Sequence, residues 1–477
     1  MLAALYMLLS AVIDTKMTIW LLVGADLVAF ASVPSVLLRR RGRPVAALSW
    51  LLAVAALPYV GAILWWTLGR THLDRLRRRR ARRPFRTPRD PDSSLSMMPF
   101  YNAEYMGSDG IFAPTSGNRL ELLVDSEFTE ALRQAIRAAT VEIDLLFYIW
   151  NDDSTGTEIR DLLVQRAREG LTVRILVDDM GSPAMRGDFA DPLRAAGAQV
   201  LRFLPVFFRP WNPTLNFRNH RKLVVVDHKL ALTGGANIGT EYESHWHDLG
   251  VRVTGPAVSD LHEVFCEDWA FARQRRPRPE FACPSMARPP AAVGGDGVVA
   301  IVASGPDRDR QRMADAFFLA ISSAVERVYV TTPYFIPTEP IQAVLRAAAQ
   351  RGVDVRLMVP QRSDVQLVQV ASRPYYQELL DEGVRIFEYK PRTLHAKAIV
   401  VDDGLALLGS ANVDLRSFRL NFELVCVAES QSLARDLRTL FEKNQADCQE
   451  VRLQDLAATS LWDRLVESVA HLVSPLL

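Results

Sequence analysis

A polar motif that occurs twice constrains this 477-residue chain more than any other feature. The motif reads His-x-Lys and then, after four further residues, Asp. Its members are His220, Lys222 and Asp227 and, 175 positions later, His395, Lys397 and Asp402. Each copy leads at the same spacing into a segment of small residues that ends in Asn, GGAN at 234–237 and GSAN at 409–412. The duplication predicts two similar halves that bring their motifs to one shared site.

Each motif is predicted to adjoin a buried strand. Residues two apart on a strand lie on the same face, so the histidine and the lysine of one copy are expected to point the same way. An apolar run from Leu223 to Val226 lies between the lysine and the aspartate of the first motif, and such a run is typical of a buried strand. The histidine and the lysine of each motif are therefore expected to project side by side from one face, next to a buried strand.

This set of side chains suits substitution at a phosphodiester. Two ammonium groups and amide donors around the phosphate would stabilise the charge of the transition state, and the candidates are Lys222, Lys397, Asn237 and Asn412. One histidine can attack phosphorus as a neutral imidazole, while the second protonates the departing alkoxide and then deprotonates the next acceptor. A carboxylate on the far ring nitrogen would fix the tautomer of each histidine. Asp248 and Glu423, each 28 residues beyond a motif histidine, are the candidates for this role.

The two motifs resemble those of the phospholipase D superfamily, and the amino-acid sequence around them is similar to that of bacterial cardiolipin synthases. The resemblance covers the chain from about Leu120 to Leu477 and rests on segments such as LNFRNHRKLVVVD, LHAKAIVVDD and GSANVDLRSFRLNFE. It implies that the histidines and lysines of both motifs are catalytic and that Asp227 and Asp402 support them by holding a loop. One position departs from the pattern: Gly235 stands where the wider superfamily has Ser, which removes a hydroxyl donor from the first half.

The resemblance implies a membrane phosphatidyltransferase that makes cardiolipin and uses no cofactor. By analogy, His220 displaces glycerol from phosphatidylglycerol to give a phosphatidyl-histidine. His395 protonates the glycerol and then activates a hydroxyl of a second phosphatidylglycerol. Two alternatives remain open: a phospholipase D-type hydrolase that releases phosphatidic acid, and a catalytically silent lipid-binding scaffold. The second substrate and the oligomeric state also remain open.

Several polar residues near the motifs are weaker candidates. His245 and His247 form an HxH pair, but no third ligand lies at a suitable spacing, so we expect a surface or supporting role and no catalytic metal. Tyr148 and Tyr334 each follow the first strand of their half. A tyrosine at this place can contact a ligand or pack in the core, and both roles remain open. The arginines at 218, 221 and 416 flank the motifs and are expected to be solvated caps more often than phosphate ligands.

The charge of the chain is distributed unevenly. The formal net charge is +1, yet residues 1–92 hold 15 Lys or Arg against 5 Asp, which gives +10 and leaves −9 for the remainder. A protein that reads nucleic acid usually has a basic folded domain, so this distribution disfavours a nuclease. We expect no nucleic-acid partner and an anionic membrane surface as the partner of the basic segment.

Two apolar segments near the N-terminus predict a membrane anchor. They span Thr18 to Leu38 and Val45 to Gly69, and each approaches the length that crosses a bilayer. Ten arginines follow between Arg70 and Arg89, which predicts a multi-pass protein of the bacterial cell (inner) membrane with its catalytic part in the cytoplasm. A re-entrant hairpin and a pair of buried helices in a soluble domain are the alternatives.

The rest of the chain alternates between helical and strand patterns. Helices are predicted at 127–139, 157–169, 311–325 and 340–350, and strands at 141–149, 172–177, 327–332 and 354–359. This predicts an α/β fold with two phospholipase D-like α/β sandwich halves related by a pseudo-twofold axis, preceded by a membrane hairpin of two helices. The predicted domains are an anchor at 1–70, a basic segment and linker at 71–118, and catalytic halves at 119–285 and 286–477.

Overall fold

The structure is a computed structural model that describes residues 15–39, 44–69, 111–205, 216–273, 288–307, 311–457 and 460–473. The chain divides into two compact units. One comprises residues 1–78 together with 206–216, and the other comprises residues 79–205 together with 217–477. The second unit holds both motifs, so we call it the catalytic unit.

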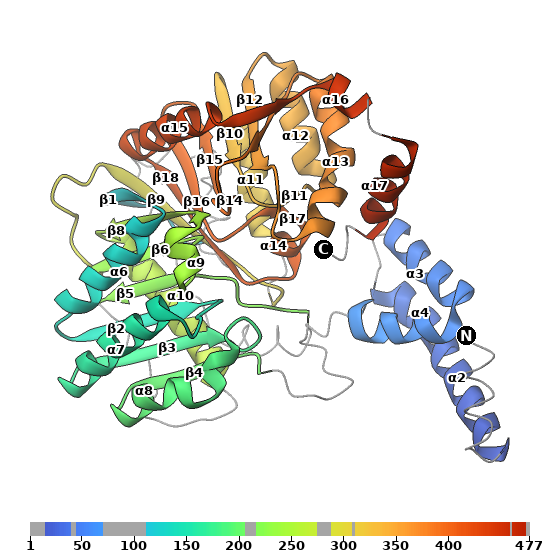
Figure 1. Cartoon of the computed structure of the whole chain (residues 1–477), viewed down its shortest axis with the longest axis horizontal. Coiled ribbons are helices and arrows are strands. Elements are labelled where there is room, and N and C mark those ends of the chain that lie inside the picture. The colour runs from blue at the N-terminus through green and yellow to red at the C-terminus, as the bar shows by residue number, and fades with distance from the viewer. Residues whose placement is uncertain are drawn as a thin grey trace. The chain divides into compact units, whose positions relative to one another are not determined.

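A 15-stranded mixed sheet forms the centre of the catalytic unit (Figure 1). The first half contributes β1 (Thr115–Val124), β2 (Glu142–Phe147), β3 (Thr172–Asp178), β4 (Gln199–Phe203), β5 (Leu223–Val226), β6 (Leu230–Gly234) and β8 (Leu249–Thr254). The second half contributes β9 (Gly297–Ser304), β10 (Arg327–Thr331), β12 (Asp354–Pro360), β13 (Arg385–Tyr389), β15 (Ala398–Val401), β16 (Leu405–Gly409), β18 (Glu423–Glu429) and β19 (Cys448–Val451).

The strand order shows the internal symmetry directly. The halves meet where β1 runs antiparallel to β9, with Thr115 opposite Val299. Outward from this junction the first half follows the order β1-β8-β6-β5-β2-β3-β4, and the second follows β9-β18-β16-β15-β10-β12-β13 before ending in β19. Corresponding strands therefore lie at corresponding distances from the junction, which confirms the predicted fold of two related α/β halves.

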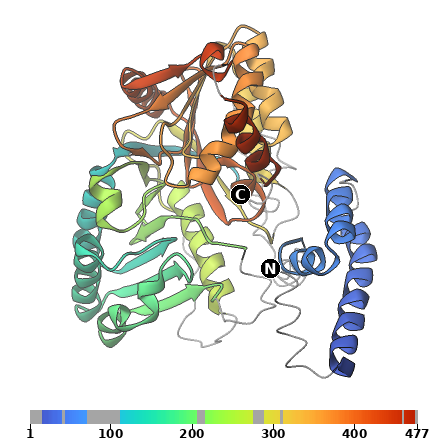
Figure 2. The same cartoon turned by 45° about the vertical axis from the view of Figure 1, so that its right-hand side comes forward.

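Helices cover both faces of this sheet (Figures 1 and 2). One layer contains α6 (Ser126–Ala138), α7 (Ser154–Arg168) and α8 (Asp191–Ala195) in the first half, and α11 (Arg312–Ser322), α12 (Glu339–Gln350) and α13 (Gln366–Asp381) in the second. The opposite layer contains α10 (Ala257–Arg273) and α15 (Gln431–Gln445).

The alternation of side chains along each strand separates these layers. On β2, Ile143 and Leu145 belong to the core formed with α6 and α7, whereas Asp144 between them faces His262 of α10 at 3.2 Å. On β10, Val328 and Val330 belong to the equivalent core of the second half. Tyr329 between them stacks on Phe441 of α15. The period of two along a strand thus supplies both helical layers.

The predicted helices and strands are confirmed to within a few residues. The differences lie at the ends: α7 begins at Ser154 instead of 157, and α11 ends at Ser322 instead of 325. Strand β1 begins at Thr115, inside the segment that the sequence assigned to a linker. The predicted boundary at 285 and the arginine-rich run lie outside the described residues.

Among the cysteines the structure adds one detail. Cys426 and Cys448 are free thiols, while Cys266 is disulfide-bonded.

The other unit is helical. It contains α2 (Thr15–Arg39), α3 (Pro44–Ala56), α4 (Pro58–Leu64) and a π-helical turn, η1 (Trp65–Gly69). Three contacts join these helices to α2: Tyr59 to Asp26 at 3.0 Å, Trp65 to Ser35 at 3.2 Å and Trp66 to Ser32 at 2.9 Å. The second predicted membrane segment is therefore divided, because Leu57 lies between α3 and α4.

The predicted pair of membrane-crossing helices is not supported. Within the described part of the chain, no helix combines the length and the apolar character that crossing a bilayer requires. The helix α2 spans 25 residues, and the second predicted segment consists of shorter pieces. The predicted multi-pass arrangement consequently finds no support in this structure.

Candidate active site

Both motifs lie at the start of short buried strands in the centre of their half. Lys222 directly precedes β5 and Lys397 directly precedes β15. All residues of these two strands are buried, so the strands hold the motif side chains in fixed positions. Lys222, His395 and Lys397 are buried, and the side chain of His220 is 12% exposed.

Each motif histidine contacts a carboxylate from the other half. Nδ1 of His220 lies 3.1 Å from Oε2 of Glu423, and Nδ1 of His395 lies 2.5 Å from Oδ2 of Asp248. The sequence identified both carboxylates, each 28 residues after a histidine of its own copy. The structure exchanges them between the copies, so each half completes the site of the other.

The backbone explains this exchange. Asn219 forms a parallel bridge with Phe422, and the amide of His220 donates to the carbonyl of Phe422 at 2.9 Å. In the second motif, β14 (Thr393–Leu394) pairs in parallel with β7 (Trp246–His247). The segment before each histidine therefore runs beside the segment before the carboxylate of the other half. No short-range sequence pattern carries this long-range pairing.

The two histidine–carboxylate pairs are not equivalent. Ser410 donates to Oε2 of Glu423 at 2.5 Å, and Asn421 donates to Oε1 at 3.2 Å. In the first half, Gly235 occupies the place of Ser410 and offers no hydroxyl. A Cβ atom at Gly235 would lie 2.1 Å from Oδ1 of Asp248, so this position has no room for a side chain. The inequality of the halves that the sequence suggested is therefore present in the geometry.

Burial and neighbouring charges shift the titration of the site. Burial lowers the pKa of Lys222 to about 7, with the charge of Lys397 as the second cause. Burial lowers the pKa of Lys397 to about 8. Burial also lowers the pKa of both motif histidines, against the opposing effect of their carboxylate partners. In the unliganded site burial therefore favours the neutral form of both imidazoles, and a nucleophilic histidine must be neutral.

The carboxylates remain charged despite their burial. Burial by itself would raise the pKa of Asp248 and Glu423. The nearby lysine and histidine charges outweigh burial and hold both pKa values below the ordinary range. Each imidazole therefore has an anion at Nδ1, which directs its lone pair to Nε2.

The lysines are oriented by the histidines of their own motif. The ammonium of Lys222 donates to the carbonyl of His220 at 2.7 Å, and that of Lys397 donates to the carbonyl of His395. Tyr148 lies beside this pair: its ring meets the His220 ring edge-on at 4.9 Å, and the Lys222 ammonium lies 5.6 Å from its centroid. Tyr148 thus contacts the candidate site.

The motif aspartates contact backbone instead of the histidines and lysines. Asp227 accepts hydrogen bonds from the amides of Thr140, Val141 and Glu142 at 2.8–2.9 Å. Asp402 accepts from the amides of residues 325–327 at 2.8–3.0 Å. Each aspartate therefore fixes the turn that enters the first parallel strand of its half. This geometry fits the loop-holding role expected of both residues.

The two asparagines lie near the motifs but in different hydrogen-bond patterns. Oδ1 of Asn237 accepts from the amide of Ile149 at 3.1 Å. Nδ2 of Asn412 donates to Asp414 at 3.1 Å. Both side chains are buried.

Two of the flanking arginines form buried ion pairs. Arg221 pairs with Asp268 at 2.6 Å, with both side chains fully buried, and Arg218 lies 3.4 Å from Asp178. The expectation of solvated caps was therefore wrong for these two arginines.

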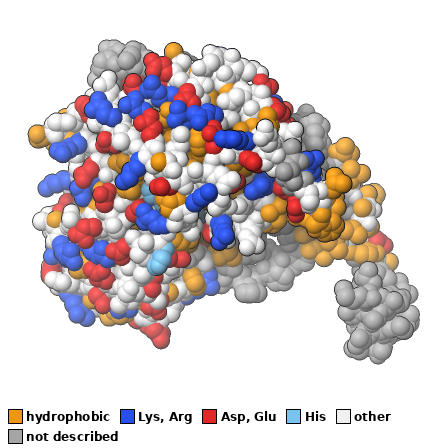
Figure 3. Space-filling view, turned by 45° about the horizontal axis from the view of Figure 1, so that its top comes forward, with side chains coloured by type: hydrophobic (Ala, Val, Ile, Leu, Met, Phe, Trp, Pro, Cys, Tyr) orange, Lys and Arg blue, Asp and Glu red, His pale blue; other side chains and the backbone are white. Residues whose placement is uncertain are grey.

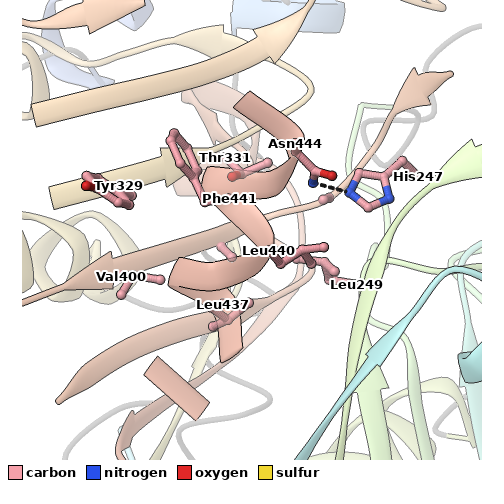
Figure 4. Close-up of a pocket in the computed structure, with 11 residues that line it drawn as sticks. His247, Leu249, Tyr329, Thr331, Val400, Leu437, Leu440, Phe441 and Asn444 are labelled. Atoms are coloured by element: carbon pink, nitrogen blue, oxygen red, sulfur yellow. Dashed lines mark hydrogen bonds between the residues drawn. The ribbon is translucent and has the colours of Figure 1, made fainter. Parts of the chain in front are cut away.

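His247 belongs to the support of the second histidine. Its Nδ1 lies 2.8 Å from Asp125, and its Nε2 lies 2.8 Å from the amide nitrogen of Asn444 (Figure 4). Its carbonyl accepts the amide hydrogen of His395 at 2.8 Å. Because Asn444 comes from α15 of the second half, His247 links the two halves beneath His395. His245, by contrast, is exposed.

Aromatic residues around His395 were not identified from the sequence. The ring of Trp246 meets the His395 ring at 4.8 Å, and Tyr242 lies at 6.4 Å. Both residues belong to the segment before Asp248, so the available signal was their closeness in sequence to that carboxylate.

A separate buried cluster contains the one group of described residues whose ligand atoms converge closely enough for a metal ion: Glu142, His228 and His262. His228 and Glu142 contact each other directly, and the other oxygen of Glu142 pairs with Arg174 at 2.9 Å. The cluster lies at the start of β2, whereas Tyr148 and His220 lie beyond its end. It is therefore distinct from the motif site, and the expectation of no catalytic metal stays a prediction.

Known proteins match the chain over most of its length. Residues 132–269 and 318–444 match the family described as "Cardiolipin synthase, PLD-like domain", and residues 25–70 match "Phospholipase_D-nuclease N-terminal". The chain is 34% identical to cardiolipin synthase 1 of Bacillus anthracis over 468 residues, which cover 91% of this chain and 89% of that protein. It is 36% identical to cardiolipin synthase A of Pseudomonas aeruginosa (strain LESB58) over 481 residues, which cover 96% of each.

A solved structure shares the fold. The phosphatidylserine synthase of Haemophilus influenzae Rd KW20 superposes with a TM-score of 0.57 at 18% identity, over 75% of this chain and 95% of that one. At this level of identity the likeness concerns the fold alone.

Proposed function

The chain belongs to the PLD-like cardiolipin synthases of the phospholipase D superfamily, and on that premise we propose that it forms cardiolipin from two molecules of phosphatidylglycerol. Membership of this family makes the protein a phosphatidyltransferase. The observation that carries the finer proposal is the crossed arrangement of two buried histidines, each with a carboxylate at Nδ1.

The first half-reaction forms a covalent enzyme. Nε2 of His220 attacks the phosphorus of phosphatidylglycerol, and the bond from phosphorus to the glycerol oxygen breaks. The anionic phosphate of the bound lipid raises the pKa of His395, so His395 is protonated in the complex. It donates its Nε2 proton to that oxygen, becomes neutral, and glycerol leaves as a neutral alcohol. Glu423 stabilises the positive charge that the His220 ring acquires on forming the phosphorus–nitrogen bond.

The second half-reaction regenerates the enzyme. A hydroxyl of a second phosphatidylglycerol attacks the phosphatidyl-histidine, His395 removes its proton, and the phosphorus–nitrogen bond breaks. The products are cardiolipin and free His220, so the kinetics are ping-pong. Lys222 and Lys397 stabilise the phosphate oxygens in both transition states. Asp227 and Asp402 hold the turns described above, and Asn237 and Asn412 support the same site.

The distribution of contacts favours His220 as the nucleophile. Glu423 accepts side-chain hydrogen bonds from Ser410 and Asn421, whereas Asp248 accepts one further hydrogen bond, from the backbone amide of Leu249. The carboxylate behind His220 is therefore held by more donors than Asp248. A fixed anion suits the nucleophilic histidine, because its ring stays positively charged for as long as the intermediate lasts. The histidine that acts as acid and base instead gives up its proton and takes one back in each cycle.

We further propose an association with the membrane, in keeping with the lipid-modifying family and with the match of residues 25–70 to its N-terminal region. The bacterial cell membrane is the expected location, with the catalytic unit on the cytoplasmic side. The domains proposed from the sequence are an anchor at 1–70, a basic segment and linker at 71–118, and catalytic halves at 119–285 and 286–477.

Lipid mass spectrometry tests this function. Purified full-length protein and its His220→Ala and His395→Ala variants are incubated with phosphatidylglycerol in bilayers. We expect cardiolipin and glycerol from the intact protein and neither product from the variants. Phosphatidic acid as the sole product would instead identify a hydrolase. Absence of any turnover, with phosphatidylethanolamine also tested as co-substrate, would favour a lipid-binding scaffold.

A further inference from the structure

The helix α17 (Leu461–Val473) exposes a stripe of large apolar side chains. The exposed fractions are 85% for Leu461, 71% for Trp462, 54% for Leu465, 40% for Val466 and 56% for Val469. Residues 461, 465 and 469 recur every four positions, as do 462 and 466, so all five lie along one side of the helix. Single exposed apolar residues are ordinary, but a continuous stripe indicates a binding surface.

The other side of α17 packs on the catalytic unit. Ala470 is buried in a small cluster with Val368 and Ala371 of α13. The ring of His471 meets that of Tyr375 edge-on at 4.7 Å. The helix is therefore attached to α13 by one side and presents its apolar stripe on another.

Two further apolar side chains are exposed at the start of α13, directly before the residues of that helix that pack on α17. Val365 and Leu367, at the start of that helix, are 39% and 46% exposed. Asp364, directly before them, accepts a hydrogen bond from Tyr334 at 2.7 Å, and Tyr334 packs against the same cluster that holds Ala470. Burial lowers the pKa of Lys397, and Asp364 is one of the carboxylates whose charge opposes that shift. The start of α13 thus lies within electrostatic reach of a motif lysine.

The stripe contrasts with the surroundings on the catalytic unit. On the face shown in Figure 3, basic and acidic side chains are interspersed over much of this unit. Such a mixed charged surface is typical of solvent-facing protein.

A tryptophan within an apolar stripe suits the boundary between headgroups and acyl chains, because its ring is apolar and its N–H is a donor.

We propose that the α17 stripe, with Val365 and Leu367, docks the catalytic unit onto the surface of the bilayer that contains its lipid substrate. This inference rests on the proposed function, because a phosphatidyl donor must pass from the bilayer to the buried histidines. Interfacial helices bind by placing Trp and Leu side chains at the acyl boundary while their polar side stays outside. In this protein the side of α17 that carries Ala470 and His471 is held against α13, so docking would set the position of the site over the membrane.

A comparison of two substrates tests the proposal. Full-length protein in phosphatidylglycerol bilayers is compared with the same protein in phosphatidylcholine bilayers, supplied with short-chain phosphatidylglycerol dissolved below its critical micelle concentration. The variant is Trp462→Ser/Leu465→Ser, and the matched control is Val293→Ser, which changes an apolar side chain that is 93% exposed. We expect the double variant to transfer bilayer lipid at least tenfold more slowly than the intact protein. Its rate with dissolved lipid should stay within twofold of the intact protein. The control variant should match the intact protein with both substrates.

Three results would overturn docking on lipid. An unchanged rate on bilayer lipid would remove the role of the stripe. An equal loss on both substrates would make α17 a structural support of α13. A change in oligomeric mass of the double variant would assign the stripe to a second copy of the chain. Failure of the proposed function remains distinguishable, because it appears in the intact protein as phosphatidic acid, or as no product, with dissolved lipid.

Discussion

The crossed histidine–carboxylate pairs make a specific prediction for Glu423→Gln. This substitution should slow the attack of His220 on phosphorus, because the imidazole becomes a cation in that step and Glu423 is the anion beside it. At 3.1 Å, and with an effective dielectric constant of about 20, a pair of unit charges interacts by about 5 kcal/mol. That energy corresponds to a rate factor of about 10⁴. Since glutamine retains a hydrogen-bonding group, we expect a loss between about 10² and 10⁴.

A phosphatidyl ester of p-nitrophenol isolates this step. Nitrophenolate leaves without protonation, so its initial burst measures formation of the phosphatidyl-enzyme independently of an acid catalyst. Glu423→Gln should slow the burst by the stated factor. Asp248→Asn, which acts on His395, should leave the burst within about threefold of the intact protein. With phosphatidylglycerol, whose alkoxide needs a proton, both variants should be slow.

Three further variants complete the design. His395→Ala should retain the burst and His220→Ala should abolish it, which identifies the nucleophile. Glu429→Gln is the matched control, because Glu429 lies on the same strand, β18, and is half-buried. The reasoning would be refuted if His220 proved to be the nucleophile while Asp248→Asn slowed the burst and Glu423→Gln spared it.

Three other predictions concern the surroundings of the pair. The pKa values of Lys222 and Lys397 are about 7 and 8, so the free enzyme loses these two positive charges as the pH rises. A plot of kcat/KM against pH should therefore decline through this range. A flat plot up to pH 9 would contradict this prediction. The decline in kcat should occur at higher pH, since a bound phosphate raises both pKa values. Gly235→Ala should reduce turnover of phosphatidylglycerol at least tenfold in a steady-state assay, because its Cβ would lie 2.1 Å from Asp248; unchanged turnover would show that the carboxylate has room to move. Asp227→Asn should destabilise the protein by about 1.5–3 kcal/mol through loss of charge-assisted hydrogen bonds, measured by thermal unfolding, with an unaltered melting temperature as the contrary result.

Local patterns predicted much of the fold. The alternation along β2 and β10 and the amphipathic helices between strands depend on neighbours in sequence, so their positions agree to within a few residues. The duplication predicted two halves, and the mirrored strand order about β1 and β9 confirms them. Hydrophobic length alone was a poorer guide near the N-terminus. There, Pro58 begins a new helix within the second apolar segment.

The candidate site was predicted in composition but not in pairing. The spacing from the motifs identified Asp248 and Glu423. Asp248 directly precedes β8 and Glu423 begins β18, and each of these strands follows the motif of its own half. Their exchange depends on the pairing of β7 with β14 and of Asn219 with Phe422. These contacts join segments about 150–200 residues apart, and such contacts leave no local pattern. The same limit concealed the position of Trp246 beside His395.

The covalent intermediate provides the most direct test of the proposed mechanism. The His395→Ala variant is incubated with the p-nitrophenyl phosphatidyl ester, quenched, digested and analysed by mass spectrometry. Because this variant can form the intermediate but lacks the base that activates an acceptor, we predict that one phosphatidyl group accumulates per chain, attached to His220. Nitrophenolate release without an adduct, or an adduct on any other residue, would contradict the account.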